Sequence, residues 1–412
     1  MSAAPESTLE PLFGDEIACA LCAFALLVPF TIAGANLAWG AVLVALLFAA
    51  RKGRKLDFAA ARGALKIPLW LYVAAALASV AFGVAPLHSL RYLHQDVHKL
   101  WLYYLLSIAL ASTAAKPPLE ACLAAGFSLA GLVGIAQSLH ALATGNLAGF
   151  ARAHAFVHPV TFGEQACLFA LGAVCFLLDP PASAASPRAR RAAACFFALC
   201  MAALLLSNTR AAMVALASGL AALIPFLDRR LRGRICLGTA AIGVLLLGMD
   251  LAFKDRSLLG QSLGWWPSNN PAGAQFMRLT LWKAAWRMGL DHPIFGVGIN
   301  NYRQQFPAYF QIALEGGART WGTAHNLYLH HFAERGVAGL AALAGLGVAM
   351  TARAWRRARR RPRAWNLWAL AALAAFWTMN LTEVALQTEI LWMLVFFIWL
   401  RAEALERRAE TA

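Results

Sequence analysis

The chain has 412 residues, of which 60% are hydrophobic and only 14% are charged. A soluble globular protein carries roughly 25% charged residues, so this composition excludes a water-soluble fold and predicts an integral membrane protein. The formal net charge is +16, but Lys and Arg are concentrated in short clusters between apolar runs, at 51–66, 229–234 and 353–363. Such clusters orient membrane spans and contact anionic headgroups, so we expect membrane lipids and no nucleic acid among the partners.

Twelve apolar runs follow one another along the chain and predict an all-α, polytopic membrane protein with a single domain over residues 1–412. A helix that crosses a bilayer needs about 20 mainly apolar residues. The predicted spans are 17–31, 32–50, 67–84, 98–114, 119–141, 160–178, 192–208, 211–227, 235–252, 324–350, 366–381 and 385–400. Acidic residues but no Lys or Arg precede the first run, so we expect an uncleaved first span rather than a signal peptide.

The distribution of basic residues predicts the orientation of the chain. If the connections alternate across the membrane, 24 of the 36 Lys and Arg residues fall on one side, together with the C-terminal tail. The positive-inside rule therefore predicts that both termini are cytoplasmic. One large connection, at about 253–323, then lies on the periplasmic side.

The segment 275–290 of this periplasmic loop, QFMRLTLWKAAWRMGL, has the pattern of an amphipathic helix. Arg278, Trp282 and Trp286 are spaced at i, i+4 and i+8, so they lie close together on a helix surface. Trp and Arg are typical of helices that lie in the membrane interface, and we expect that placement here. A solvated loop helix is the alternative.

Ionisable side chains precede and enter the apolar run in TAHNLYLHHFAERGVAGL, residues 323–340. Charged groups in such places are costly and are either structural anchors or parts of a functional site. Thr323 is a plausible N-cap, which would place His325 in the first turn of the helix. Asn326 is suited either to orienting a substrate or to capping the helix.

From 278 to 340 the chain has an Arg-x3-Trp helix (Arg278, Trp282), then HPIFGVGINNY (292–302), a polar gap and TAHNLYLHHFAERGVAGL (323–340). This succession resembles the C-terminal signature of the O-antigen ligase and polymerase family. The resemblance implies a GT-C-like membrane glycosyltransferase of the bacterial inner membrane with a periplasmic active site. It implies transfer of a polysaccharide from undecaprenyl diphosphate to a sugar hydroxyl of lipid A–core, inverting and independent of metal or other cofactors. The family's central catalytic histidine corresponds to His325.

The chemistry of such a transfer matches the residue types at hand. Histidine exchanges protons near neutral pH and can serve as the base for an acceptor hydroxyl. The alternative for His325 is an interfacial histidine bonded to backbone. His330, His331 and Glu334 lack the spacing of a zinc site, and we interpret them as packing or polar contacts between helices. Glu334 and Arg335 are neighbours in sequence and need not pair.

Arginines on the predicted outer face are candidates for binding the donor's diphosphate, because a guanidinium binds phosphate bidentately. Arg210 ranks first, since SNTRAAM lies between two long apolar runs with almost no loop to solvate it. Arg278 and then Arg152 follow, and Arg91 and Arg303 are weaker candidates. The alternative for each is an arginine that extends to the membrane surface without a role in binding.

Three other functions share some of these features. An O-antigen polymerase would lengthen the lipid-linked glycan itself, and a protein O-oligosaccharyltransferase would modify secreted proteins. A transporter or flippase would place its ionisable residues near the membrane midplane, often in repeated halves. Because the ionisable residues here gather toward one predicted face, the sequence favours a glycosyltransferase over a transporter. Among the glycosyltransferases, the short tail after the last predicted span, residues 401–412, favours the ligase.

Overall fold

The computed structural model describes residues 14–63, 65–113, 117–144, 152–179, 186–252, 274–310 and 320–411, and these are almost entirely helical. The α-helices are α2 (Glu16–Leu27), α3 (Ile32–Arg51), α4 (Lys66–Phe82), α5 (Pro86–Leu90), α6 (His94–Ser112), α7 (Leu119–Ala143), α8 (Pro159–Leu178), α9 (Pro187–Leu206), α10 (Arg210–Leu223), α11 (Arg229–Ala252), α13 (Ala274–Asp291), α14 (Tyr302–Tyr309), α15 (Leu327–Arg360), α16 (Ala364–Met379) and α17 (Glu389–Thr411). Two short 3-10 helices, η1 (Phe58–Arg62) and η4 (Ile224–Phe226), lie between them.

Each of the twelve predicted spans coincides with one helix. Among the described residues, five helices are long and apolar enough to cross a membrane, namely α3, most of α7, α8, α9 and α15. Four shorter segments, within α2, α4, α10–η4 and α16, are also apolar. The chain is therefore a helical membrane protein, while the count of twelve spans stays a prediction. The helices α6, α11 and α17 each carry charged residues toward one end, which interrupts their apolar stretch.

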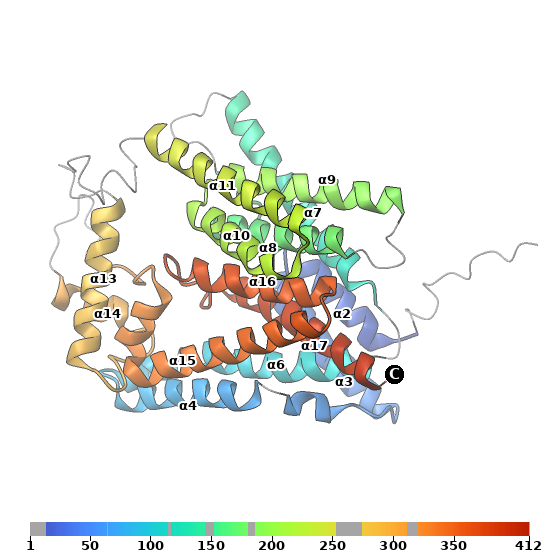
Figure 1. Cartoon of the computed structure of the whole chain (residues 1–412). Helices are drawn as coiled ribbons and strands as arrows, with labels where there is room; N and C mark the ends of the chain where they lie inside the picture. The colour runs from blue at the N-terminus through green and yellow to red at the C-terminus, as the bar shows by residue number, and fades with distance from the viewer. Residues whose placement is uncertain are drawn as a thin grey trace, which may run out of the picture.

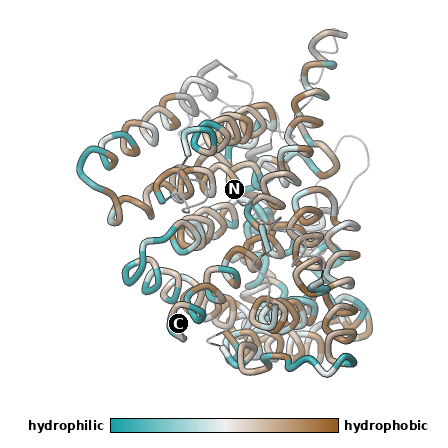
Figure 2. Tube along the Cα trace, turned by 90° about the vertical axis from the view of Figure 1, so that its right-hand side faces the viewer, coloured by the Kyte–Doolittle hydropathy of each residue, from teal (hydrophilic) through white to brown (hydrophobic). Residues whose placement is uncertain are grey.

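The helices α8, α16 and α17 form the centre of the molecule. The side chains of α16 are buried on nearly all sides, and those of α8 are buried over most of its length. Trp368 of α16 joins the two helices, because its indole Nε1 donates to the carbonyl of Leu168 at 2.9 Å. Figure 1 shows α16 between the group of α8 and α10 and the group of α15, α6 and α4. In Figure 2 brown hydrophobic residues dominate the helices, whereas teal residues are most frequent near turns and helix ends.

The predicted cytoplasmic clusters gather at one end of the bundle, which we call the basic end. Arg54 pairs with Asp15 at 2.8 Å and donates to the carbonyl of Ser112 at 2.6 Å. Arg408 donates to the carbonyl of Thr113, and the C-terminus lies at this end (Figure 1). The helix α13 lies at the opposite end, where it runs across the direction of α4, α6 and α15 (Figure 1).

The helix α13 was predicted to be amphipathic, and its burial pattern agrees. Leu281 and Met288 are buried against α14 and α15, whereas Leu279, Trp286 and Leu290 are exposed. An exposed apolar stripe on a helix at the end of the bundle is what an interfacial helix presents. Residues 253–273 and 311–319 of the same connection lie outside the described residues.

The helix α15 is broken at Gly336, whose φ of 60° and ψ of −160° are not helical. The turn 293–298 docks into the break by exchanging hydrogen bonds with it. Val337 and Ala338 donate to the carbonyls of Pro293 and Ile294, at 2.8 and 3.1 Å. In return the carbonyls of Ala333 and Glu334 accept from Val297 and Gly298, at 2.9 and 3.0 Å. Four backbone groups on the two sides of the break are thereby paired.

Glycine is required on both sides of this contact. Gly296 has a φ of 72°, and a Cβ there would meet the backbone of Glu334 at 2.2 Å. A Cβ at Gly336 would meet the carbonyl carbon of Ile294 at 2.4 Å. The two glycine-containing elements of the signature are therefore the two halves of one backbone contact, which fixes the turn 293–298 onto α15.

Candidate active site

His325 lies directly ahead of α15 in an unusual backbone conformation. Its φ of 47° is left-handed, which costs a residue with a side chain about 1–3 kcal/mol and is common at functional sites. Asn326 caps the helix, because its Oδ1 accepts from the N–H of Leu329 at 2.9 Å. The prediction that Thr323 caps the helix and places His325 in its first turn was wrong. Asn326 takes the capping position, so the helix begins only at Leu327.

The start of α15 is held against the connection between α16 and α17. The Nδ2 group of Asn326 donates to the carbonyl of Leu381 at 2.9 Å. The N–H of Leu327 donates to the carbonyl of Asn380, also at 2.9 Å. These bonds bring His325 beside Glu383, which lies in the same connection.

Glu383 binds two of the predicted site residues at once. Its Oε2 lies 2.9 Å from Nδ1 of His325, and its Oε1 accepts from Nη2 of Arg278 at 3.1 Å. The Glu383 side chain is 14% exposed, whereas those of His325 and Arg278 are 34% and 33% exposed. The carboxylate is thus largely buried beneath an imidazole and a guanidinium that both reach solvent.

The contact with Glu383 determines which ring nitrogen of His325 can act as a base. A carboxylate only accepts hydrogen bonds, so the proton of the neutral ring lies on Nδ1 and the lone pair lies on Nε2. A carboxylate in this position also stabilises the imidazolium that forms when Nε2 takes up a proton. The ring of Trp321 packs edge-on against the imidazole, with the centroids 6.2 Å apart.

Arg152 approaches the same group from the segment ahead of α8. Its Nε donates to the carbonyl of Ser207 at 2.6 Å, and its Nη2 donates to Oγ1 of Thr209 at 3.0 Å. Burial lowers the pKa of Arg152 below its ordinary value, although the nearby Glu383 carboxylate opposes this shift, and a guanidinium remains charged at neutral pH. Because Nε and Nη2 bind Ser207 and Thr209, the orientation of the Arg152 guanidinium is fixed.

Arg210 begins α10 directly after Thr209, the residue that Arg152 binds, so both arginines lie at the same corner of the bundle. The side chain of Arg210 is half-buried.

His158 caps α8, since its Nδ1 accepts from the N–H of Val160 at 3.3 Å. Burial, then the charge of Arg152, lowers the pKa of His158, and the charges of Glu383 and His325 also reach it.

Arg91 and Arg303 lie elsewhere. Both are exposed, Arg91 at the end of α5 and Arg303 on α14. Among the described residues, the structure brings neither into contact with the His325–Glu383 pair. Of the other outer arginines, Arg287 is exposed on α13, and Arg256 and Arg319 lie outside the described residues.

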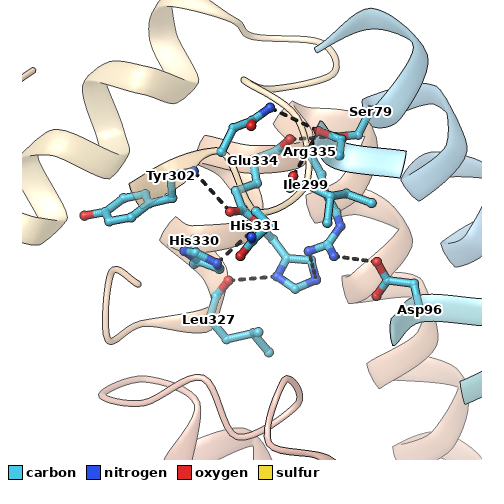
Figure 3. A network of polar contacts seen from close by, with 12 residues as sticks. Ser79, Asp96, Ile299, Tyr302, Leu327, His330, His331, Glu334 and Arg335 are labelled. Atoms are coloured by element: carbon cyan, nitrogen blue, oxygen red, sulfur yellow. Dashed lines mark hydrogen bonds and ion pairs between the residues drawn. The ribbon is translucent and has the colours of Figure 1, made fainter. Parts of the chain in front are cut away.

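A second polar group lies within the helices, one turn and more beyond His325 (Figure 3). Arg335 donates to Oδ2 of Asp96 at 2.6 Å and contacts Nε2 of His331 at 3.0 Å. His331 in turn lies 3.1 Å from the hydroxyl of Tyr72. All four side chains are buried, and they join α15 to α6 and α4.

Glu334 belongs to the same buried region and faces the turn 293–302. Its Oε1 accepts from the N–H of Tyr302 at 3.3 Å, and its Oε2 lies 3.4 Å from Nε2 of His330. Figure 3 shows Glu334 and Arg335 directed to different partners, as the sequence predicted. His331 and Glu334 make polar contacts with α4 and α14, in agreement with their interpretation as packing or polar contacts between helices, whereas His330 pairs with Glu334 of its own helix and packs its ring against Tyr302. Among the described residues, no group of three or more His, Cys, Asp or Glu side chains could hold a metal ion.

Sequence reasoning missed Glu383, the residue that connects the site. A signal was present in MNLTEVALQTEI (379–390), where an acidic residue stands between two long apolar runs with little loop to solvate it. That argument was applied to Arg210 but not to Glu383. Asp96 was missed for a different reason, because its partner Arg335 is 239 positions away.

Residues 195–344 match the family model described as O-antigen ligase. The match contains Arg210, Arg278 and His325, the turn 293–298 and the break in α15, and it confirms the predicted resemblance over these residues. Arg152 and Glu383 lie outside the matched stretch. The comparison with curated proteins gives no match.

Proposed function

We propose that the chain is an O-antigen ligase, and the match of residues 195–344 to the family model described as O-antigen ligase supports this proposal. It would transfer polysaccharide from undecaprenyl diphosphate to a sugar hydroxyl of lipid A–core. The reaction would take place at the periplasmic face of the inner membrane, with both termini in the cytoplasm. The basic end and the His325 site lie at opposite ends of the bundle, which supports this orientation.

The observation that carries the proposal is the contact of one buried carboxylate with both His325 and Arg278. In the proposed reaction Nε2 of His325 takes the proton of the acceptor hydroxyl. The hydroxyl oxygen then forms a bond to the anomeric carbon of the donor sugar, on the face opposite the diphosphate. The bond between that carbon and the phosphate oxygen breaks, and the diphosphate leaves with the electron pair. One displacement of this kind inverts the anomeric configuration.

The arginines would neutralise the departing diphosphate. Arg278 approaches from α13, Arg152 from the segment ahead of α8 and Arg210 from the start of α10. Preorganised donors to developing charge typically contribute about 3–4 kcal/mol each. The role requires no metal ion, because fixed guanidinium charges supply the neutralisation. Glu383 is a positioning residue, since it holds the imidazole and the Arg278 guanidinium side by side.

The decisive experiment supplies purified protein with undecaprenyl-diphosphate glycan, either alone or together with lipid A–core. We expect glycosylated lipid A–core in the second reaction and unchanged donor in the first. Elongated donor in the first reaction would identify a polymerase instead, and transfer to a protein acceptor would identify an oligosaccharyltransferase. His325→Ala should lower the rate by about 10²–10⁴-fold. His140→Ala, which removes an exposed imidazole on α7, is the matched control.

A further inference from the structure

The basic end contains a cavity between α15 and α17 that the proposed reaction does not use. From α15 its lining comes from Arg353, Arg356, Arg357 and Arg360, and from α17 it comes from Glu403, Glu406, Arg407 and Glu410. Both sets have the spacing i, i+3, i+4, i+7, so each forms one face of its helix. The cavity has a volume of about 60 Å³. A single water needs only about 10–15 Å³, so the space admits a larger polar group.

The charges around this cavity are unbalanced. Five arginines face three glutamates, and Glu403 alone serves three of the arginines. Its carboxylate accepts from Nε and Nη2 of Arg353 at 2.8 and 2.5 Å, and it also binds Nη1 of Arg357. An anion in the cavity would neutralise the arginine charge that the three glutamates leave unbalanced.

Arg357 provides an independent indication of a ligand. Its side chain is 5% exposed, and its guanidinium lies over the ring of Trp399, 4.5 Å from the centroid. Nη1 binds Glu403, but the buried Nε and Nη2 have no hydrogen-bond partner among the described residues. Buried N–H groups of a charged side chain that lack an acceptor are costly. Two adjacent donors of one guanidinium match the two oxygens of a phosphate group.

The length of α15 places this cavity at the depth of lipid headgroups. Residue 353 lies 26 positions after the start of the helix at Leu327, at most about 39 Å away at 1.5 Å per residue, because the break at Gly336 shortens the direct path. The hydrocarbon core of a bilayer is about 30 Å thick. With the start of α15 at the outer surface, the arginines therefore emerge among the headgroups of the opposite leaflet.

We propose that the cavity between α15 and α17 binds a phosphate group, held by Arg357 from within and by Arg356 and Arg360 from its mouth. The phosphate could come from the headgroup of an anionic phospholipid or from a free phosphate in solution. Both sources offer the same oxygens to the arginines, and the experiment distinguishes them. The site lies at the end of the bundle opposite His325 and does not depend on the proposed transfer reaction.

The test compares two double variants of the full-length protein that have the same net charge. Arg356→Gln with Arg360→Gln removes the exposed arginines at the mouth and leaves the buried pair of Arg357 and Glu403 in place. Arg359→Gln with Arg361→Gln removes two exposed arginines of the same segment that do not line the cavity. Thermal unfolding is followed in phosphatidylcholine nanodiscs with increasing phosphatidylglycerol. A parallel series in detergent adds inorganic phosphate, with chloride at matched ionic strength as the reference.

We expect phosphatidylglycerol to stabilise the wild-type protein and the 359/361 variant alike. The 356/360 variant should need roughly thirtyfold more of the anionic lipid for the same stabilisation, since each of the two basic contacts near the surface contributes about 1 kcal/mol. Stabilisation by inorganic phosphate in detergent, above that by chloride, would identify a free phosphate as a ligand. Stabilisation by lipid alone would identify the headgroup. Equal responses of the two double variants, or no response of the wild-type protein to either anion, would overturn the proposal.

Discussion

Nδ1 of His325 lies 2.9 Å from Oε2 of Glu383, although 58 positions separate the two residues in the chain. The same carboxylate pairs with Arg278, which comes from a third segment. Three separate elements therefore meet at one acidic group, and the geometry of the proposed base depends on a residue that need not touch either substrate.

Replacing Glu383 by Gln tests this dependence. The amide oxygen can still accept from Nδ1, but the charge that stabilises the imidazolium and holds Arg278 is lost. We expect the turnover rate of ligation to fall by about 10²-fold or more, while Glu383→Asp retains part of it. The measurement is kcat and KM for donor and acceptor, with the unfolding temperature as a check on folding. Activity of Glu383→Gln near that of the wild-type protein would remove Glu383 from the site.

Replacing Arg152 by Lys tests the value of the guanidinium fork. Lysine keeps the charge, but its single nitrogen cannot bind Ser207 and Thr209 and also present a flat edge to a diphosphate. We expect a loss of about tenfold or more in kcat/KM for the lipid-linked donor, in line with a typical loss for a charged hydrogen bond. Arg303→Lys, at an exposed position on α14, serves as the control and should change little. A similar response of the two variants would show that Arg152 has no special role.

Replacing Gly336 by Ala tests the contact between the turn and the break in α15. The new Cβ would meet Ile294 at 2.4 Å and would force a left-handed φ on a residue with a side chain. We expect the protein to lose at least about 1–3 kcal/mol of stability. Gly345→Ala on the same helix has no atom within 4 Å of its Cβ, and it should be neutral or slightly stabilising. Tryptophan fluorescence during thermal unfolding in detergent compares the two.

His158 predicts a pH dependence of stability. Burial and the charge of Arg152 lower its pKa in the folded protein below the ordinary value of 6.5, so only the unfolded chain protonates readily just below that pH. Stability is therefore fully present above about 6.5 and is lost as the pH falls through the folded pKa. His158→Asn keeps a capping group that does not titrate. The wild-type protein should lose more stability than this variant between pH 7 and 5, and parallel pH profiles would contradict the assignment.

The sequence predicts the helices well because apolar runs of membrane length have few alternative structures. The candidates His325, Arg278, Arg152 and Arg210 come from the family resemblance and from charged groups at helix ends. The fold brings His325 and Arg278 to one carboxylate, while the roles of all four stay predictions. The break at Gly336 is not visible in the sequence, because the apolar run continues after it and its cause is a turn about 40 residues earlier. Glu383 does carry a signal, as an acidic residue between two apolar runs, but its contacts with His325 and Arg278 become apparent only in the fold.

The hydrogen bonds exchanged at the break link the segments that carry His325 and Arg278, because the turn 293–298 contacts the first part of α15 and follows α13. The nine residues of α15 ahead of Gly336 are not hydrogen-bonded as a continuous helix to the part that follows. The carbonyls of Ala333 and Glu334 accept from the turn 293–298 instead. That turn begins two residues after α13 ends, so the helix that carries Arg278 is connected directly to the turn that binds the break in α15. If the turn moved, the imidazole of His325 and the guanidinium of Arg278 would move together and keep their spacing. Both would then shift relative to Arg152 and Arg210, which are held ahead of α8 and at the start of α10.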